Sequence, residues 1–269
     1  MIGPPSCAPW DTATPEAKGE TPLPTYNQEA VVLRTRDLGE ADRLVTLFTR
    51  ERGKVNGVAR GARRAASRLA GSLQPLSHIR CQLARARTLD IITQVELIES
   101  FPSVRGDLTL VTYANHFLEL VDVVAPEREA GDLFPLLLGG LHLLAAGVDP
   151  GLVSRAFELR LLAAAGFGPA LRDCARCGRP VEERGDLSFS PGEGGVLCGE
   201  CDGGALLRRS VLAALIYLQE ADLRQIGRLA VDERDRGEME GLLRAHLTYH
   251  LDRPLRSLAF LDTLRRGER

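Results

Sequence analysis

Four cysteines in the second half of the chain form two close pairs, and their spacing is the most chemically specific pattern in the sequence. Both pairs have the form C-x-x-C, at 174–177 and 198–201, with twenty residues between them. Each C-x-x-C turn brings two thiolates within reach of one ion, and two turns supply the four ligands of a closed tetrahedral zinc site. We therefore predict that one structural Zn²⁺ is bound by Cys174, Cys177, Cys198 and Cys201.

The residues around these cysteines favour a zinc ribbon-like module over residues 172–204. Gly178 follows the first pair and suits a tight turn, and "LSFSPGEGGVL" predicts a β-hairpin with a glycine-rich turn. The alternatives are unmetallated thiols or a redox dithiol, but a redox C-x-x-C normally begins a helix beside a strand. Because four thiolates leave no open position on the metal, we expect zinc to stabilise the local fold, by about 10 kcal/mol.

A second feature is a strongly basic segment nearer the N-terminus. The stretch "NGVARGARRAASRLAGSLQPLS", residues 56–77, contains four arginines and no acidic residue. The wider window 50–87 has a net charge of +9 and the rest of the chain −11, because the total is −2. Such an asymmetry is typical of a protein that binds a polyanion. The predicted nucleic-acid contacts are Lys54, Arg60, Arg63, Arg64, Arg68, Arg85 and Arg87.

The basic segment lies among five stretches with strand character, and a long connection separates the third from the fourth. This pattern predicts an oligonucleotide-binding (OB-fold) β-barrel over residues 26–101, with an SH3-like barrel as the alternative. Between residues 28 and 100 the only aromatic side chain is Phe48, which we expect in the core. Without a stacking platform, the barrel should contact the backbone of single and double strands without sequence preference and with strong salt dependence.

From residue 102 the apolar residues recur at intervals of three and four, which predicts helices. The predicted fold class is therefore α+β and multidomain: an N-terminal OB-fold barrel, then a helical domain over 102–269 that contains the cysteine module.

Residues 1–25 contain six prolines and no secretory apolar region, and predict a disordered tail. No uncharged apolar run is long enough to span a membrane. The paired cysteines and the missing export signal predict a reduced, cytoplasmic protein. Cys81 should be a small buried side chain.

Other patterns that could indicate an active site are weak. "KVNG" at 54–57 differs from a K-x-D-G nucleophile motif because Asn56 replaces the aspartate. His246 and His250 share one helix face, but Leu247 stands where H-E-x-x-H requires glutamate, so we expect ordinary packing. Neither a P-loop nor a G-x-S-x-G motif is present. The protein is therefore predicted not to be an enzyme, the alternatives being a zinc-ribbon nucleic-acid enzyme or a scaffold whose arginines bind an acidic protein.

Several segments, in this order, resemble the RecO family of bacterial DNA repair and recombination mediators. The similar segments are "EAVVLRTRDLGEADRLVTLFTRERGKVNGVARGARR", "FELRLLAAAGFGPALRDCARCG", "FSPGEGGVLCGEC" and "LLRAHLTYHLDRPLRSLAFL". The resemblance covers about residues 28–262. Some family members lack the zinc cysteines, whereas all four are present here.

The resemblance implies a non-enzymatic protein that binds single- and double-stranded DNA and anneals complementary strands. It also implies a complex with the partner RecR and contact with the acidic tail of single-strand DNA-binding protein (SSB). Such a protein helps to load the RecA recombinase onto SSB-coated DNA, and we expect it to be cytoplasmic and nucleoid-associated.

Overall fold

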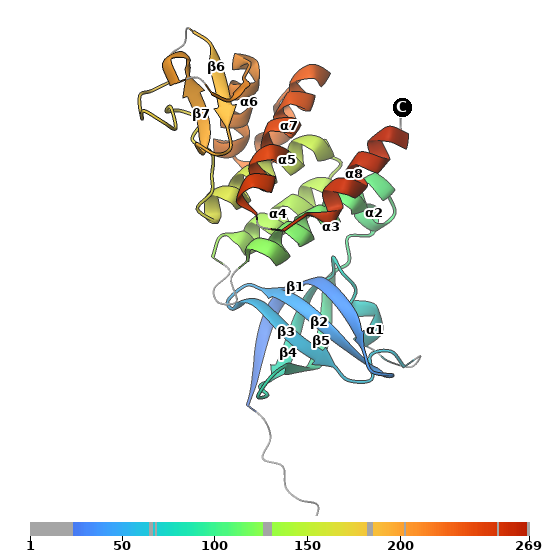
Figure 1. The fold of residues 1–269 in the computed structure, drawn as a ribbon. Helices are drawn as coiled ribbons and strands as arrows, with labels where there is room; N and C mark the ends of the chain where they lie inside the picture. The colour runs from blue at the N-terminus through green and yellow to red at the C-terminus, as the bar shows by residue number, and fades with distance from the viewer. Residues whose placement is uncertain are drawn as a thin grey trace, which may run out of the picture.

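The computed structural model describes residues 24–64, 67, 69–125, 131–181, 185–201, 203–251 and 253–267. A β-barrel lies at one end, a group of helices packs against it, and a small sheet lies on the far side of the helices (Figure 1). The predicted tail falls outside the described residues up to residue 23. Thr25 already begins the first strand.

The barrel has five strands in the closed order β1-β2-β3-β5-β4. Neighbouring strands are antiparallel except β3 and β5, which close the barrel in parallel. A short helix, α1, lies between β3 and β4. This five-stranded topology favours the OB-fold over the SH3-like alternative. The elements are β1 Thr25–Leu38, β2 Asp42–Thr49, β3 Gly53–Ala59, α1 Leu69–Ser72, β4 His78–Ala84 and β5 Asp90–Glu99.

The strands of the barrel bury both of their faces where they approach the helices. Because successive side chains of a strand point to opposite faces, Val32 and Leu47 fill the barrel interior. Val31 and Phe48 instead belong to a core shared with the helices. The Phe48 ring lies 5.9 Å from the ring of Phe134. Phe48 is thus a core residue, as predicted, but it joins the barrel to the helical domain.

Two of the longer helices, α3 and α5, begin at aspartate caps. The side chains of Asp107 and Asp149 accept hydrogen bonds from the backbone N–H groups of Leu110 and Leu152, both at 2.9 Å. Helix α8 lies within the predicted helical domain, but it was not predicted as a separate helix. The helices are α2 Pro102–Arg105, α3 Leu108–Val124, α4 Leu133–Ala145, α5 Pro150–Ala164, α6 Arg209–Glu220, η2 Leu223–Arg228, α7 Glu233–His250 and α8 Arg256–Gly267.

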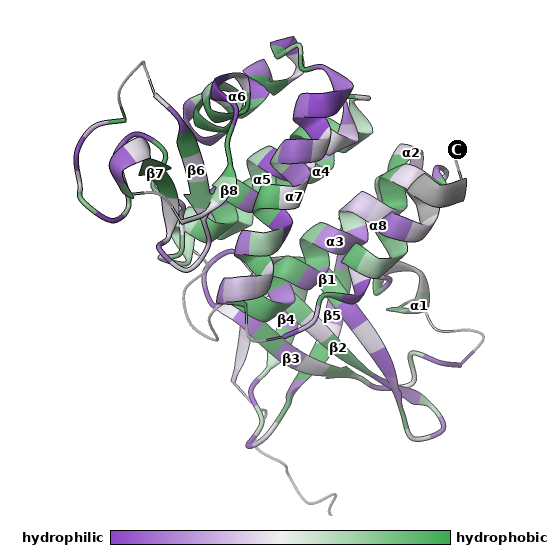
Figure 2. Cartoon of the chain, turned by 45° about the horizontal axis from the view of Figure 1, so that its top comes forward, coloured by the Kyte–Doolittle hydropathy of each residue, from purple (hydrophilic) through white to green (hydrophobic). Residues whose placement is uncertain are grey.

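The cysteine module lies between α5 and α6 and packs on the helices. Its sheet has the order β7-β6-β8, with β6 Leu187–Ser190, β7 Gly195–Cys198, the 3-10 helix η1 Gly199–Cys201 and β8 Ala205–Leu206. The predicted hairpin and its glycine-rich turn are therefore confirmed. Phe189 and Val196 share a core with α6 and α7. In Figure 2, α4 and α5 are largely hydrophobic, whereas the start of α7 is hydrophilic.

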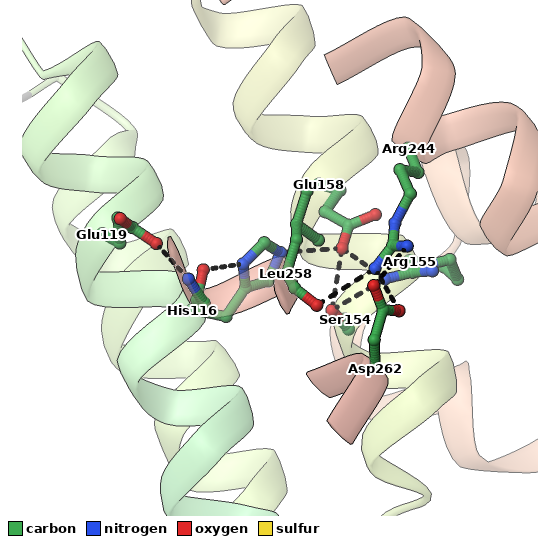
Figure 3. Close-up of polar contacts among 9 residues, drawn as sticks. His116, Glu119, Ser154, Arg155, Glu158, Arg244, Leu258 and Asp262 are labelled. Atoms are coloured by element: carbon green, nitrogen blue, oxygen red, sulfur yellow. Dashed lines mark hydrogen bonds and ion pairs between the residues drawn. The ribbon is translucent and has the colours of Figure 1, made fainter. Parts of the chain in front are cut away.

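A buried polar network attaches α8 to the rest of the helical domain (Figure 3). Glu119 on α3 accepts hydrogen bonds from the backbone N–H groups of Arg256 and Ser257, at 3.0 and 2.8 Å. These are among the first N–H groups of α8, which lack partners within the helix. His116 Nε2 lies 3.0 Å from Glu158 Oε1 and its Nδ1 2.7 Å from Ser257 Oγ. These hydrogen bonds thus link α5, α3 and α8 in one continuous network.

Candidate metal centre and nucleic-acid surface

The four paired cysteines converge on one point. Their sulfur atoms all lie within 4.8 Å of one another, and Cys177 Sγ is 3.9 Å from Cys198 Sγ. Sulfurs that share a tetrahedral ion at about 2.3 Å are about 3.8 Å apart. All four residues are free cysteines. Within the described part of the chain, this is the only group of three or more His, Cys, Asp or Glu side chains with metal-binding geometry.

The backbone around the first pair is folded tightly beneath the sulfurs. The Cys174 N–H donates to the carbonyl of Arg179, and the Gly178 N–H donates to the carbonyl of Cys174, both at 2.8 Å. Gly178 has a φ of 71°, which residues with a side chain rarely adopt. The tight turn predicted after the first pair is thus present and requires glycine.

Hydrogen-bond donors around the first pair of sulfurs favour thiolates, which are the form that binds metals, whereas burial raises the pKa of Cys201 to about 12. Burial disfavours the Cys174 thiolate, but backbone N–H groups, first that of Cys198 at 3.5 Å, outweigh this effect and lower the pKa of Cys174 to about 6. The Arg179 guanidinium donates to Cys177 Sγ at 3.4 Å and lowers the pKa of that thiol. The donor set therefore fits a metal ion bound by four sulfurs.

The predicted contact residues of the basic segment differ in how they are paired. Arg60 and Arg64 are exposed, and neither forms an ion pair with any described residue. Arg63 donates to the carbonyl of Gly39 at 2.6 Å and lies 3.4 Å from Asp37. Arg68 lies outside the described residues. Among the described cations of this loop, Arg60 and Arg64 are therefore the two without an acidic partner.

Lys54 occupies the junction between the barrel and the helices. Its Nζ donates to the backbone carbonyl of Asp122 at 2.6 Å and lies 3.7 Å from the carboxylate of the same residue. Arg34 also pairs with Asp122, at 2.8 Å. The Lys54 side chain is only 18% exposed. Lys54 thus holds β3 against α3. This structural role accounts for the lysine of "KVNG" without assigning it the role of a nucleophile.

The barrel contains an aromatic residue that the sequence analysis missed. Tyr26 is the second residue of β1 and lies just before residues 28–100, the range in which Phe48 is the only aromatic residue. The guanidinium carbons of Arg52 and Arg85 lie 4.4 and 5.6 Å from the centre of its ring. The Tyr26 hydroxyl donates to Asp90, and burial together with this contact raises the pKa of Tyr26. Because Tyr26 lies inside the predicted barrel range of residues 26–101, the sequence already indicated an aromatic side chain on the barrel.

Arg85 and Arg87, the remaining predicted contacts, lie in the loop between β4 and β5. Both are exposed, and neither has an ion pair in the described part of the chain. The Asp90 carboxylate accepts a hydrogen bond from the Ala86 N–H at 3.2 Å. Asp90 therefore holds both Tyr26 and the loop that carries these two arginines.

Two family models match nearly all of the chain outside its termini. "Recombination protein O N terminal" matches residues 23–101 and "Recombination protein O C terminal" matches residues 105–259. The chain belongs to the RecO family. This confirms the resemblance predicted from the four sequence segments.

Several RecO relatives, each named "DNA repair protein RecO", align over almost their whole length. The relative from Symbiobacterium thermophilum is 42% identical over 247 residues, which are 89% of this chain and 98% of the relative. The relative from Pelotomaculum thermopropionicum is 41% identical over 242 residues, 88% of this chain and 93% of the relative. The relative from Roseiflexus sp. is 44% identical over 245 residues, which are 89% of this chain and 86% of the relative.

Two further sequence predictions on this RecO chain concern features outside the basic surface. Cys81 is buried in the barrel, and burial raises the pKa of its thiol to about 12, so it is a packing residue as predicted. His246 is fully buried on α7, and its Nε2 lies 2.8 Å from the carbonyl of Phe167. None of the helices in the described ranges is long and apolar enough to cross a membrane.

Proposed function

We propose that this protein is a DNA repair and recombination mediator that works by binding and not by catalysis. In this proposal it binds single- and double-stranded DNA, anneals complementary strands, and helps to load a recombinase onto SSB-coated DNA. Its partners are RecR and the acidic tail of SSB, and it acts on DNA in the cytoplasm, at the nucleoid. Membership of the RecO family supports each of these roles.

The observation that carries the proposal is a set of uncompensated guanidinium groups on the barrel. These cations have no ion pair with any described residue, so a phosphate backbone would not have to displace an acidic side chain from them. They occupy the loops after β3 and after β4. The set consists of Arg60, Arg64, Arg85 and Arg87. Of the other predicted contacts, Arg63 and Lys54 have internal partners and are expected to contribute less.

Fluorescence anisotropy of a labelled single-stranded oligonucleotide at several salt concentrations tests this function. We expect tight binding that is indifferent to sequence and falls steeply with salt, because each neutralised phosphate releases counterions. Absence of binding at low salt would contradict the proposal, and the alternative of a scaffold for an acidic protein would replace it. A cleavage product that depends on a divalent ion would instead support a nucleic-acid enzyme.

We further propose that the ion held by the four cysteines is Zn²⁺ and that its role is structural. Four sulfur ligands suit zinc and leave no coordination position for a substrate. Protein purified under reducing conditions without chelator should contain about one zinc per chain. A Cys198→Ser variant should lose the metal and the protection of the module from proteolysis. A full complement of zinc in that variant would contradict the assignment.

Annealing and the protein contacts need separate measurements. Two complementary labelled strands should pair faster in the presence of the protein than without it, and SSB-coated strands should pair as well. An SSB lacking its acidic tail should not support this reaction. RecR should co-elute with the protein in gel filtration. An unchanged annealing rate with tailless SSB would remove the tail contact from the proposal.

A further inference from the structure

A hollow of about 410 Å³ lies where the barrel meets the helical domain, and none of the four arginines of the proposed DNA surface lines it. Lys54 of β3 lines one side, and Phe167, His250 and Arg253 line the other. This volume falls in the range of about 300–1,000 Å³ that is usual for sites that bind small molecules. The hollow is therefore large enough for a flat heterocyclic group.

Aromatic rings gather beside this hollow and remain open to solvent. Phe167 is 42% exposed and Tyr249 is 62% exposed. The rings of Phe167 and His250 are stacked, with centroids 5.3 Å apart and an angle of 25° between planes. The Tyr249 ring meets His250 edge-on at 5.0 Å. Rings exposed to this extent do not serve as core.

The sequence holds Phe167 in this exposed position. Gly166 ends α5 with a φ of 82°, and the N–H groups of Gly166 and Phe167 donate to the carbonyls of Ala163 and Leu162. These two bonds form a Schellman motif with glycine at the left-handed position. The Phe167 carbonyl accepts from His246 Nε2 at 2.8 Å. The backbone that presents the ring is therefore fixed from both sides.

The charges around the hollow suit a phosphate. Arg253 is exposed and has no ion pair with a described residue. Among the described lining residues the one carboxylate, Asp122, is already neutralised by Arg34 and Lys54. The combination of an exposed aromatic ring and a guanidinium without an ion pair matches an unpaired nucleotide better than it matches an acidic peptide, which has no flat group to stack.

We propose that this hollow is a base-stacking site for single-stranded nucleic acid, in which the exposed ring of Phe167 stacks a base and Arg253 contacts its phosphate, while Tyr249 flanks the site through its contact with His250. The site rests on the proposed function and adds selectivity for unpaired strands to it. Bases in a duplex are already stacked on one another and cannot enter, whereas the barrel arginines contact either form through its phosphates. Stacking on an aromatic ring changes single-strand affinity by roughly 5- to 150-fold per base.

The test compares single-strand and duplex binding of the full chain with a Phe167→Leu, Tyr249→Ala double variant. Leucine keeps an apolar side chain at position 167 while it removes the ring. The matched control is Phe260→Ala, which removes an aromatic residue that is 50% exposed on α8 and outside this hollow. The probes are an oligonucleotide with one 2-aminopurine, whose fluorescence is quenched by stacking, and a duplex of the same length.

We expect the double variant to lose roughly 5- to 150-fold of single-strand affinity and the quenching of 2-aminopurine, with duplex affinity within about twofold of the wild type. The Phe260→Ala control should match the wild type in both. Unchanged single-strand binding by the double variant, or an equal loss on the duplex, would overturn the stacking site while the barrel surface stands. Loss of RecR binding with intact oligonucleotide binding would overturn it in favour of a protein contact. If the wild type bound neither probe, the proposed function itself would fail.

Discussion

Four arginines in two loops of the barrel differ in their electrostatic surroundings from the paired arginines of the helical domain. In the helical domain many guanidinium groups have an acidic partner, as in the pairs Arg155–Glu158, Arg172–Glu220, Arg208–Glu238, Arg236–Asp149 and Arg244–Asp262. Two of these pairs take part in the network of Figure 3. In the barrel loops, Arg60, Arg64, Arg85 and Arg87 have no ion pair within the described ranges.

This difference shows that the number of arginines is a poor guide to function until their partners are known. A guanidinium already paired with a carboxylate holds two elements together, and its removal should change stability. A guanidinium without such a partner adds little to the fold and remains available to a polyanion. The same residue type is thus expected to have two different effects when it is replaced.

The largest effect should come from breaking the buried pair. An Arg155→Ala substitution leaves Glu158, which is fully buried, without its cation. We expect the free energy of unfolding to fall by about 3–5 kcal/mol, measured by urea denaturation. The exposed Arg234→Ala is the control and should change stability by no more than about 0.5 kcal/mol. Equal stability of the two variants would contradict the comparison.

The next effect should appear in DNA binding and not in stability. Replacing Arg60, Arg64, Arg85 and Arg87 with alanine should lower the slope of log affinity against log salt for duplex DNA by about 3 to 4, because each lost phosphate contact removes about 0.9. The free energy of unfolding should stay within about 1 kcal/mol. Anisotropy titrations and urea denaturation measure the two quantities.

A control for this variant removes the same charge from the other region. Alanine at Arg172, Arg224, Arg228 and Arg234, all exposed in the helical domain, should change the salt slope by less than about 1. A slope that fell equally in both variants would mean that total charge, and not the barrel surface, determines binding.

Acid should weaken the helical domain through Glu158. Burial alone would raise the pKa of this carboxyl, but Arg155, His116 and Ser154 outweigh it and hold the pKa below its ordinary value. The resulting stabilisation is present above the unfolded value of about 4.3 and is lost as the pH falls through the folded pKa. Urea denaturation as a function of pH should show this loss below about pH 4.3, and a Glu158→Gln variant should show a shallower one.

The smallest effect should come from the cation at the junction. A Lys54→Met substitution keeps the aliphatic part of the side chain, and Arg34 still compensates Asp122. We expect the free energy of unfolding to fall by no more than about 1 kcal/mol and DNA affinity to stay within about twofold. A loss of affinity as large as that of an Arg60→Ala variant would place Lys54 on the DNA surface.

Patterns with a short repeat were predicted well from the sequence. The strand character of β1 and β2 and the hairpin between the cysteine pairs both depend on residues a few positions apart. Exposed aromatic side chains near the proposed binding surfaces were not predicted from the sequence. Tyr26 precedes residues 28–100, the range in which Phe48 is the only aromatic residue, and Phe167 is separated in the sequence from Tyr249 and His250 by more than eighty residues.

By itself the sequence determined the order of the elements, the positions of the four cysteines and the concentration of positive charge, because these follow from local spacing and residue type. Only the tertiary structure decided which cations are compensated. Lys54 meets Asp122 across 68 residues, and Arg50 meets Glu29 and Phe134 in the same way, through contacts between elements that pack together only in the fold. A charge is neutralised by what is near it in space, and the sequence specifies that distance only after the chain has folded.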